Sequence, residues 1–129
     1  MAKLLLDSSI IVDYLRRKDK DQTILYKLIR DEAKNELYIS IITHTECYAG
    51  KSIWESADVR KALEILLSGL KILSLDERNS EMAGKLKAQY NTNIADAIIA
   101  ATSIIHNLYL VTLNTKDFEK IVDLRLFNK

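Results

Sequence analysis

The sequence predicts one α/β domain in which helices cover both faces of a mainly parallel sheet of four or five strands. Short apolar runs alternate with amphipathic helical segments along the chain, and strands separated by helices form right-handed crossovers that place helices on both faces. The 129 residues match the size of a single domain. Hydrophobic residues make up 48% of the chain and charged residues 29%, which supports a buried core. We therefore expect one three-layer α/β/α domain over residues 1–129.

The first half of the chain contains two strand candidates and three helix candidates. An apolar run at 4–6 stops abruptly at Asp7, which is typical of a buried strand that leads into a helix. Apolar residues then recur at helical spacing from position 24 onward. The expected elements are a strand at 4–6, a helix at 10–17, a helix from 24 up to 34, a strand at 37–39 and a helix at 43–52.

The second half begins with a broad apolar face at 59–67, where apolar residues fall at i, i+3, i+4, i+7 and i+8. Gly69 stands where a helix C-cap belongs. The segment 94–105 is apolar nearly all round, so we expect the most buried helix there. The other expected elements are a strand at 70–73, a helix at 82–90, a strand at 108–112, a short helix at 117–121 and a fifth, edge strand at 124–127.

Composition excludes several classes of protein. The formal net charge is +1, so a nucleic acid would need a local basic patch. A single cysteine, Cys47, and the lack of a signal-peptide pattern indicate a cytoplasmic protein. Apolar stretches stay far below the roughly 20 residues of a membrane span. Gly50-Lys51-Ser52 resembles the end of a P-loop, but Thr45 stands where that loop requires glycine, so we expect no nucleotide triphosphatase.

Four acidic residues are expected to converge at the sheet edge where open α/β folds bind ligands. Asp7 follows the first strand, and Glu46 falls in the first turn of the helix after the second. Asp96 begins the buried helix, and Asp117 follows the fourth strand. Clustered carboxylates repel one another, and a bound divalent ion removes that cost. Because no cysteine or histidine pair is nearby, oxygen ligands favour Mg²⁺ or Mn²⁺.

Most of these acids also have a structural interpretation. Thr43-x-x-Glu46 has the spacing of a capping box. Asn93 and Asn114 each stand three residues before an acid that would stabilise a helix start. Both interpretations stay open for Glu46 and Asp96, and helix capping is favoured for Asp117. Asp7 is less easily explained as structural.

Four motifs, in order and spanning nearly the whole chain, resemble those of PIN-domain ribonucleases, specifically the VapC-type toxins of bacterial and archaeal toxin–antitoxin pairs. The motifs are Leu6-Asp7-Ser8-Ser9, Thr43-x-x-Glu46-x-x-x-Gly50, Asn93-x-x-Asp96-Ala97 and Thr112-x-Asn114-x-x-Asp117-Phe118. The resemblance implies a PIN-like fold and metal-dependent hydrolysis of RNA phosphodiester bonds. It also implies a homodimer and inhibition by a small antitoxin protein from an adjacent gene.

Carried over by position, the resemblance assigns roles to individual residues. Asp7, Glu46 and Asp96 become catalytic metal-site residues for Mg²⁺ or Mn²⁺. Asp117 becomes the fourth, acting directly or by positioning the attacking water. Ser8 and Thr112 correspond to hydroxyl-bearing neighbours that hydrogen-bond the site, and Asn114 stands where some members carry an acid.

Two other functions compete with a nuclease. A phosphoacceptor signalling domain has a similar length, the same β/α order and an acidic Mg²⁺ pocket. Such domains, however, have an adjacent pair of acidic residues after the first strand, whereas here Asp7 is followed by Ser8 and Ser9. A PIN-like module could also bind RNA or a partner protein without cutting, and only the retained acids argue against it.

Other conspicuous residues have open interpretations. Tyr48 and Trp54 fit either a core or a dimer surface. The basic run at 16–20 is either a solvated surface or a contact for RNA phosphates beside the acidic edge.

Overall fold

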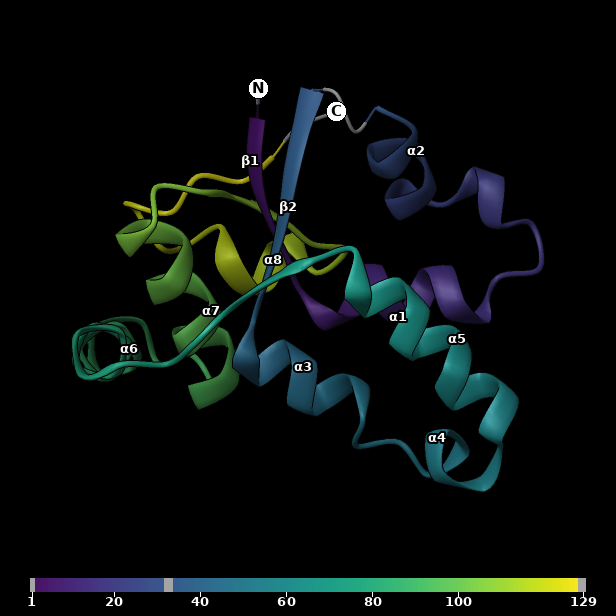
Figure 1. Ribbon diagram of the computed structural model, residues 1–129. Helices are drawn as coiled ribbons and strands as arrows, with labels where there is room; N and C mark the ends of the chain where they lie inside the picture. Colours follow the sequence, from purple (N-terminus) through teal and green to yellow (C-terminus); the bar gives the residue numbers. More distant parts are fainter. Residues whose placement is uncertain (1, 32–33, 128–129) are drawn as a thin grey trace.

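The computed structural model describes residues 2–31 and 34–127, which form a four-stranded, all-parallel sheet with helices on both faces (Figure 1). The strand order is β3-β2-β1-β4. The strands are β1 (Ala2–Leu6), β2 (Asn35–Ser40), β3 (Lys71–Leu73) and β4 (Tyr109–Val111). The predicted three-layer α/β/α fold is therefore confirmed.

The chain alternates strands and helices as expected. The helices are α1 (Ser8–Arg16), the short 3-10 helix η1 (Lys20–Gln22), α2 (Ile24–Arg30), α3 (Ile41–Cys47), α4 (Lys51–Glu55), α5 (Ala57–Ser68), α6 (Glu77–Tyr90), α7 (Ile94–Ile105) and α8 (Thr115–Phe118). Among the described residues, no helix is long and apolar enough to cross a membrane.

The central strand β1 is apolar on both faces because each face supports its own core. Leu4 and Leu6 belong to one buried cluster, shared with α1, α2 and α5. Leu5 points the other way, into a second cluster built from α6, α7 and the segment around α8. Alternate residues of a strand face opposite sides, so an uninterrupted leucine run suits a strand covered on both sides.

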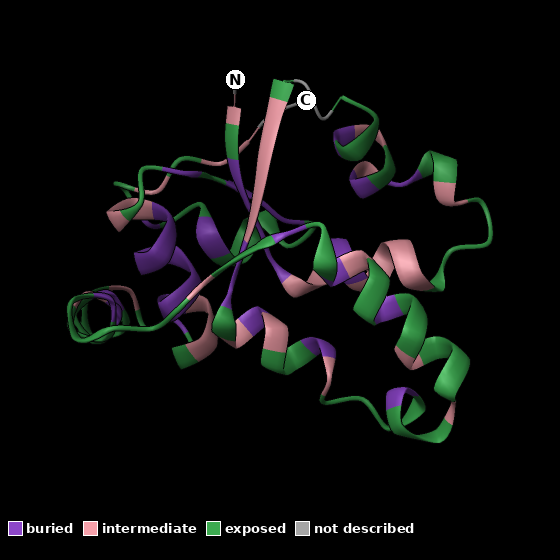
Figure 2. Cartoon of the chain, in the orientation of Figure 1, coloured by how far each residue is buried: buried purple, intermediate pink, exposed green. Residues whose placement is uncertain are grey.

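Helix α7 is the most buried helix of the described chain, as its composition predicts (Figure 2). Its fully buried positions run along nearly the whole helix: Ala97, Ile98, Ile99, Ala100, Ala101, Thr102 and Ser103. It packs closely along α6. Because α7 is held on most sides, its N-terminus, which carries Asp96, has a fixed position at the carboxyl edge of the sheet.

The predicted single helix at 43–52 is wrong: α3 and α4 are separate helices. Helix α3 begins earlier because the side chain of Ser40 accepts a hydrogen bond from the backbone N–H of Ile42 and caps the helix there. It ends at Cys47, and Gly50 precedes α4 in an extended conformation. Glu46 therefore lies in the last turn of α3, and the prediction that it lies in the first turn is also wrong.

Further boundaries differ from the predictions, including that of α6, which begins at Glu77 rather than at 82. Helix α1 begins at Ser8 because Asp7 caps it, and α2 ends at Arg30, while two of the residues expected to extend it, 32 and 33, lie outside the described residues. Helix α8 is Thr115–Phe118 rather than 117–121. The fifth strand at 124–127 is reduced to one isolated parallel bridge between Leu110 and Leu126.

Candidate active site

The candidate site lies at the carboxyl edge of the sheet. Asp7 follows β1, Thr112 follows β4, and α3 begins where β2 ends. Parallel strands bring these ends together, and this is the edge where open α/β sheets place ligands.

Asp7 is held in one orientation by hydrogen bonds to both of its carboxylate oxygens. Oδ1 accepts from the backbone N–H of Ser9 at 3.1 Å and from the Ser9 hydroxyl, and Oδ2 accepts from the Thr112 hydroxyl. Asp7 is only 4% exposed, and this burial raises its pKa, while the hydrogen bonds from Ser9 and Thr112 oppose the rise. Contrary to the sequence interpretation, Asp7 therefore does have a structural role, as the N-cap of α1.

Ser9 is a site residue that the sequence analysis missed. Its hydroxyl donates to Asp7 and accepts the backbone N–H of Leu113 at 3.1 Å, so it joins the start of α1 to the loop after β4. The Thr112 hydroxyl acts in the same way, because it accepts the backbone N–H of Asn114 at 3.0 Å. The available signal was the position of Ser9 two residues after a capping Asp, where the cap accepts a backbone N–H.

Glu46 reaches the same edge from α3. Its pKa is raised by burial and by the charges of Asp96 and Asp7, while a side-chain hydrogen bond with Ser8 opposes the rise. The capping-box interpretation of Thr43 and Glu46 is wrong, because Ser40 is the cap. Glu46 is thus free of a helix-start role, and Ser8 is a neighbour of the acidic site, as expected.

Asp96 is both part of a helix start and part of the acidic group. Asn93 caps α7: its Oδ1 accepts the Asp96 N–H at 2.8 Å, and its Nδ2 donates to Asp96 Oδ2 at 3.0 Å. Desolvation raises the pKa of Asp96, and the charges of Asp117 and Asp7 raise it further. The predicted cap is confirmed, and Asp96 still senses two other carboxylates.

Asp117 lies on α8, is exposed, and contributes through its charge. Its backbone N–H donates to the carbonyl oxygen of Asn114 at 3.0 Å, but the Asn114 side chain makes no capping hydrogen bond. The prediction of a side-chain cap at Asn114 is therefore wrong. Asp117 and Glu46 are the two exposed acids of the four, Asp96 is half-buried and Asp7 is buried.

The donor chemistry of this group suits a hydrated Mg²⁺ or Mn²⁺ ion. Burial raises the pKa of Asp7, Glu46 and Asp96. The charges of other acids raise the pKa of Glu46 and Asp96 further. Among residues 2–31 and 34–127, however, no three Asp, Glu, His or Cys side chains converge closely enough to form a ready ligand set. Mg²⁺ keeps several waters and usually takes one or two protein carboxylates, so it does not require a closed cage. The residues present fit such an ion.

Cys47 takes no part in this chemistry. It is buried, and burial raises the pKa of its thiol to about 11. The thiolate, which is the form that binds metals, is therefore scarce at neutral pH.

A cavity of about 310 Å³ opens beside Glu46. Its walls come from the four helices α1, α3, α4 and α5 and from the residue before α4: Val12, Leu15, Arg16, Glu46, Cys47, Gly50, Ser52, Ile53 and Val59. Leu15 and Val59 also line a second, mainly apolar cavity of about 530 Å³ between α1, α2 and α5. The two cavities are therefore neighbours that share the wall formed by Leu15 and Val59.

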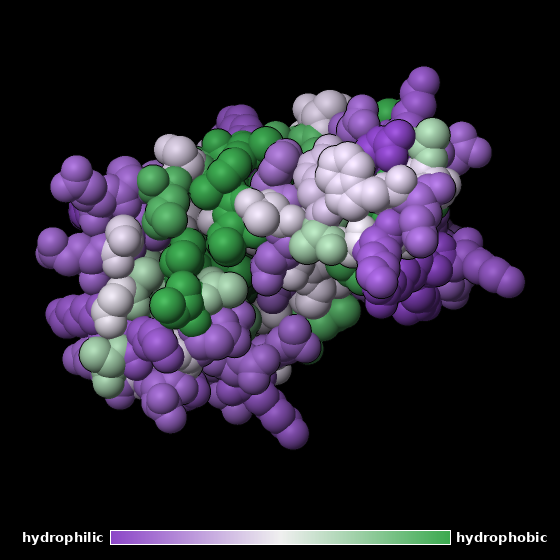
Figure 3. Space-filling model, turned by 90° about the horizontal axis from the view of Figure 1, so that it is seen from below, coloured by the Kyte–Doolittle hydropathy of each residue, from purple (hydrophilic) through white to green (hydrophobic). Residues whose placement is uncertain are grey.

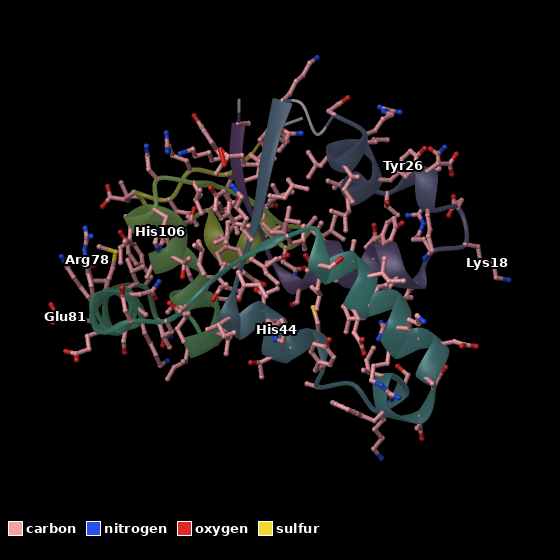
Figure 4. All side chains as sticks on the ribbon, viewed as in Figure 1. Lys18, Tyr26, His44, Arg78, Glu81 and His106 are labelled. Carbon is pink, nitrogen blue, oxygen red and sulfur yellow. The ribbon has the colours of Figure 1, made fainter. Side chains whose placement is uncertain are left out.

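The basic run after α1 divides into structural and free residues. Arg17 pairs with Asp19 at 3.0 Å, and the Lys20 ammonium donates to three backbone carbonyls at the end of α1. Arg16 lines the cavity beside Glu46. Lys18 points outward from the loop, far from the sheet edge (Figure 4). Of this run, Arg16 alone borders the cavity beside the acids.

The chain is similar to known proteins over nearly its whole length. The family model for the PIN domain matches residues 4–124. The chain is 30% identical to Ribonuclease VapC1 of Methanocaldococcus jannaschii, over 99% of this chain and 89% of that protein. The crystal structure of VapBC2 from Rickettsia felis, bound to a DNA fragment from its promoter, superimposes with a TM-score of 0.81 at 24% identity and 98% coverage of both chains. A toxin–antitoxin complex from Klebsiella pneumoniae superimposes with a TM-score of 0.73 at 28% identity and 94% coverage of both chains.

Proposed function

This chain belongs to the PIN-domain family, and from that membership we propose that it is a metal-dependent endoribonuclease and the toxin of a toxin–antitoxin pair. Residues 1–129 would form a single nuclease domain that acts in the cytoplasm, where its RNA substrate is made. The observation that carries the proposal is the placement of Asp7, Glu46 and Asp96, from three separate segments, at one edge of the sheet, where the charge of Asp7 helps to raise the pKa of the other two. The 30%-identical relative named as a ribonuclease supports the same activity.

Asp7, Glu46 and Asp96 would hold Mg²⁺ or Mn²⁺, and Asp117 would hold a second ion or orient water. A bound divalent ion neutralises charge on the scissile phosphate and helps to generate the attacking nucleophile. Polar residues of the chain orient the carboxylates that would bind the ion. Ser9 and Thr112 orient the Asp7 carboxylate, and the hydrogen bonds that they donate favour its charged form.

A phosphoacceptor domain fits the site less well. Such a domain has an adjacent acidic pair after its first strand. Here Ser8 and Ser9 follow Asp7, and Ser9 serves instead as a hydrogen-bond donor to Asp7. A non-cutting PIN-like module stays the second candidate, and an activity assay separates it from a nuclease.

We propose that the antitoxin docks along the groove between α1, α2 and α5. The groove is lined mainly by apolar residues, and Ile65 on its wall is 65% exposed. It shares the wall formed by Leu15 and Val59 with the cavity beside Glu46. A short amphipathic segment would cover the apolar part, and a basic side chain beyond it would reach the carboxylates and neutralise them. The similar Klebsiella protein pair, a toxin–antitoxin complex, supports such a partner.

We also propose a homodimer through a second apolar surface beside the site. Ile41 begins α3, Ile94 begins α7, and Ile72 lies in β3; all three are exposed, and α3 contacts both other elements. Figure 3, which views the molecule from below, shows a continuous hydrophobic area on this face. Exposed apolar patches of this kind mark interfaces.

The proposal is tested with purified protein and a single-stranded RNA. We expect cleavage with Mg²⁺ or Mn²⁺ and loss of cleavage in excess chelator. Cleavage in chelator would refute the metal site, and RNA binding without cleavage under any divalent ion would favour the non-cutting module.

A further inference from the structure

Three aromatic side chains and one arginine of α3, α4, α5 and the residue after α3 form a row in which Trp54 is exposed and the other three are half-buried. The ring centroids of His44 and Tyr48 are 5.0 Å apart, and those of Tyr48 and Trp54 are 6.0 Å apart. The guanidinium of Arg60 lies 5.7 Å from the centre of the Trp54 ring. We propose that this aromatic row, His44-Tyr48-Trp54-Arg60, stacks unpaired bases of the RNA; the proposal rests on the ribonuclease function above.

Trp54 is fixed in place although it is exposed. Its indole N–H donates to the Tyr48 carbonyl oxygen at 2.7 Å, and Arg60 donates to the Ile53 carbonyl oxygen at 3.1 Å. Ile53, the preceding residue, is 6% exposed and anchors α4 in the core, whereas Trp54 is 62% exposed. An aromatic ring that is already immobilised loses little conformational entropy when a ligand stacks on it.

The aromatic row lies next to the cavity beside Glu46 along the chain, although none of its four residues lines that cavity. Ser52 and Ile53 of α4 line that cavity, and Trp54 follows them directly in the chain. Arg16 lines the same cavity and supplies a positive charge beside the acids. An RNA strand with a phosphate at the carboxylates would therefore pass Arg16 and reach α4.

Base stacking also suits the charge of the protein. The formal net charge is only +1, so long-range attraction of RNA is weak. Proteins that bind single-stranded nucleic acid use aromatic side chains, and arginine over an aromatic ring, to hold bases of any sequence. Figure 4 shows His44 on α3, at the start of the row.

A second copy of the chain is the competing occupant. Ile41, Thr45 and Tyr48 share one face of α3 by their helical spacing, so the row adjoins the apolar surface proposed for the dimer. The surroundings of Trp54 differ from that surface, because Lys51 and Glu55 beside it on α4 are exposed and charged. Charged neighbours suit an apolar protein contact poorly, and Lys51 and Arg60 place positive charge beside the ring for an RNA strand.

Trp54 is the only tryptophan, so its fluorescence reports on the row without any mutation. A mixed-sequence single-stranded RNA oligonucleotide is titrated into the full-length protein in excess chelator. We expect saturable quenching, and little quenching by the same RNA annealed into a duplex, because the bases of a duplex are already paired and stacked. Equal quenching by the duplex would overturn the proposal.

Variants then test the contribution to binding. Trp54→Ala should weaken RNA binding about 5- to 100-fold, the effect of losing one stacked base, and should raise KM more than it lowers kcat. Trp54→Phe should keep binding within a few-fold of the wild type. The matched control is Tyr109→Ala, which removes another exposed ring beneath an arginine, Arg125 at 4.4 Å, on an edge strand; it should leave RNA binding unchanged.

The outcomes separate this inference from the ribonuclease function. If Trp54→Ala cuts and binds RNA normally, the stacking role is wrong and the function stands. If RNA quenches Trp54 but no divalent ion supports cleavage, the row binds RNA and the nuclease function is wrong. If the Trp54 fluorescence changes with protein concentration but not on addition of RNA, the row is a contact between two copies of the chain, and the proposal is overturned.

Discussion

The hydroxyl of Thr112 donates a hydrogen bond to Oδ2 of Asp7, and this contact joins two residues 105 positions apart in the chain. The two residues follow neighbouring strands, because β4 pairs directly with β1. The backbone repeats the connection, since the Asp7 N–H donates to the Val111 carbonyl oxygen at 3.2 Å. The position of the central carboxylate thus depends on the end of the chain as well as its beginning.

Replacing Thr112 with Val removes this donor and keeps the side-chain shape. A hydrogen bond to a charged group contributes about 1.5–3 kcal/mol, so we expect metal affinity and cleavage to fall roughly 10- to 100-fold. Metal binding is measured by calorimetry and cleavage by gel assay. Thr115→Val, on exposed α8, is the control and should behave as wild type. Unchanged metal affinity in Thr112→Val would show that the contact does not prepare Asp7.

Replacing Asp96 with Asn separates its charge from its place in the helix. The Asn93 cap bonds the backbone N–H of residue 96, which the substitution keeps. Relief of repulsion should keep or raise the melting temperature in chelator. RNA cleavage should fall by at least about two orders of magnitude, the scale of ~2.7 kcal/mol of transition-state stabilisation. If the variant has a lower melting temperature but cleaves RNA at the normal rate per folded molecule, Asp96 serves only to stabilise the start of α7.

The raised pKa values of Asp7, Glu46 and Asp96 make the stability of the metal-free protein depend on pH. A carboxyl with a raised pKa stabilises the fold below its unfolded pKa, and that contribution is lost as pH rises through the folded value. The melting temperature in chelator should therefore fall as the pH rises above about 4. This fall should be larger in the wild type than in Asp96→Asn. Mg²⁺ should raise it more at pH 7 than at pH 5. Identical pH profiles of the two proteins would contradict this coupling.

The groove between α1, α2 and α5 predicts a separation of binding from catalysis. Ile65→Asp places a charge on its apolar wall, so affinity for the antitoxin from the adjacent gene should fall at least about tenfold. RNA cleavage in the absence of antitoxin should be unchanged, because Ile65 is distant from the acidic residues along the chain and lines the groove rather than the cavity beside Glu46. The matched control is Val122→Asp, at a site that is 80% exposed elsewhere. Equal antitoxin affinity in both variants would place the partner on another surface.

Much of the site follows from the sequence because parallel strands end at a common edge. Asp7 is marked by the end of an apolar run and Asp96 by the start of an apolar helix, and both positions were predicted correctly. The start of α3 was less determined, because Ser40 and Thr43 can each cap a helix. Ser40 is the cap because β2 ends there. The choice between Ser8 and Ser9 likewise depended on Leu113, which only the folded chain brings close.

The segment at 124–127, too short to count as a strand, closes one side of the sheet. Both backbone groups of Leu110 that face away from β1 are already paired, with the Arg125 carbonyl oxygen at 2.9 Å and the Phe127 N–H at 2.8 Å. The opposite edge is β3, which is three residues long and begins with Lys71. An unfolded neighbour therefore finds few free backbone groups to extend into a fibril.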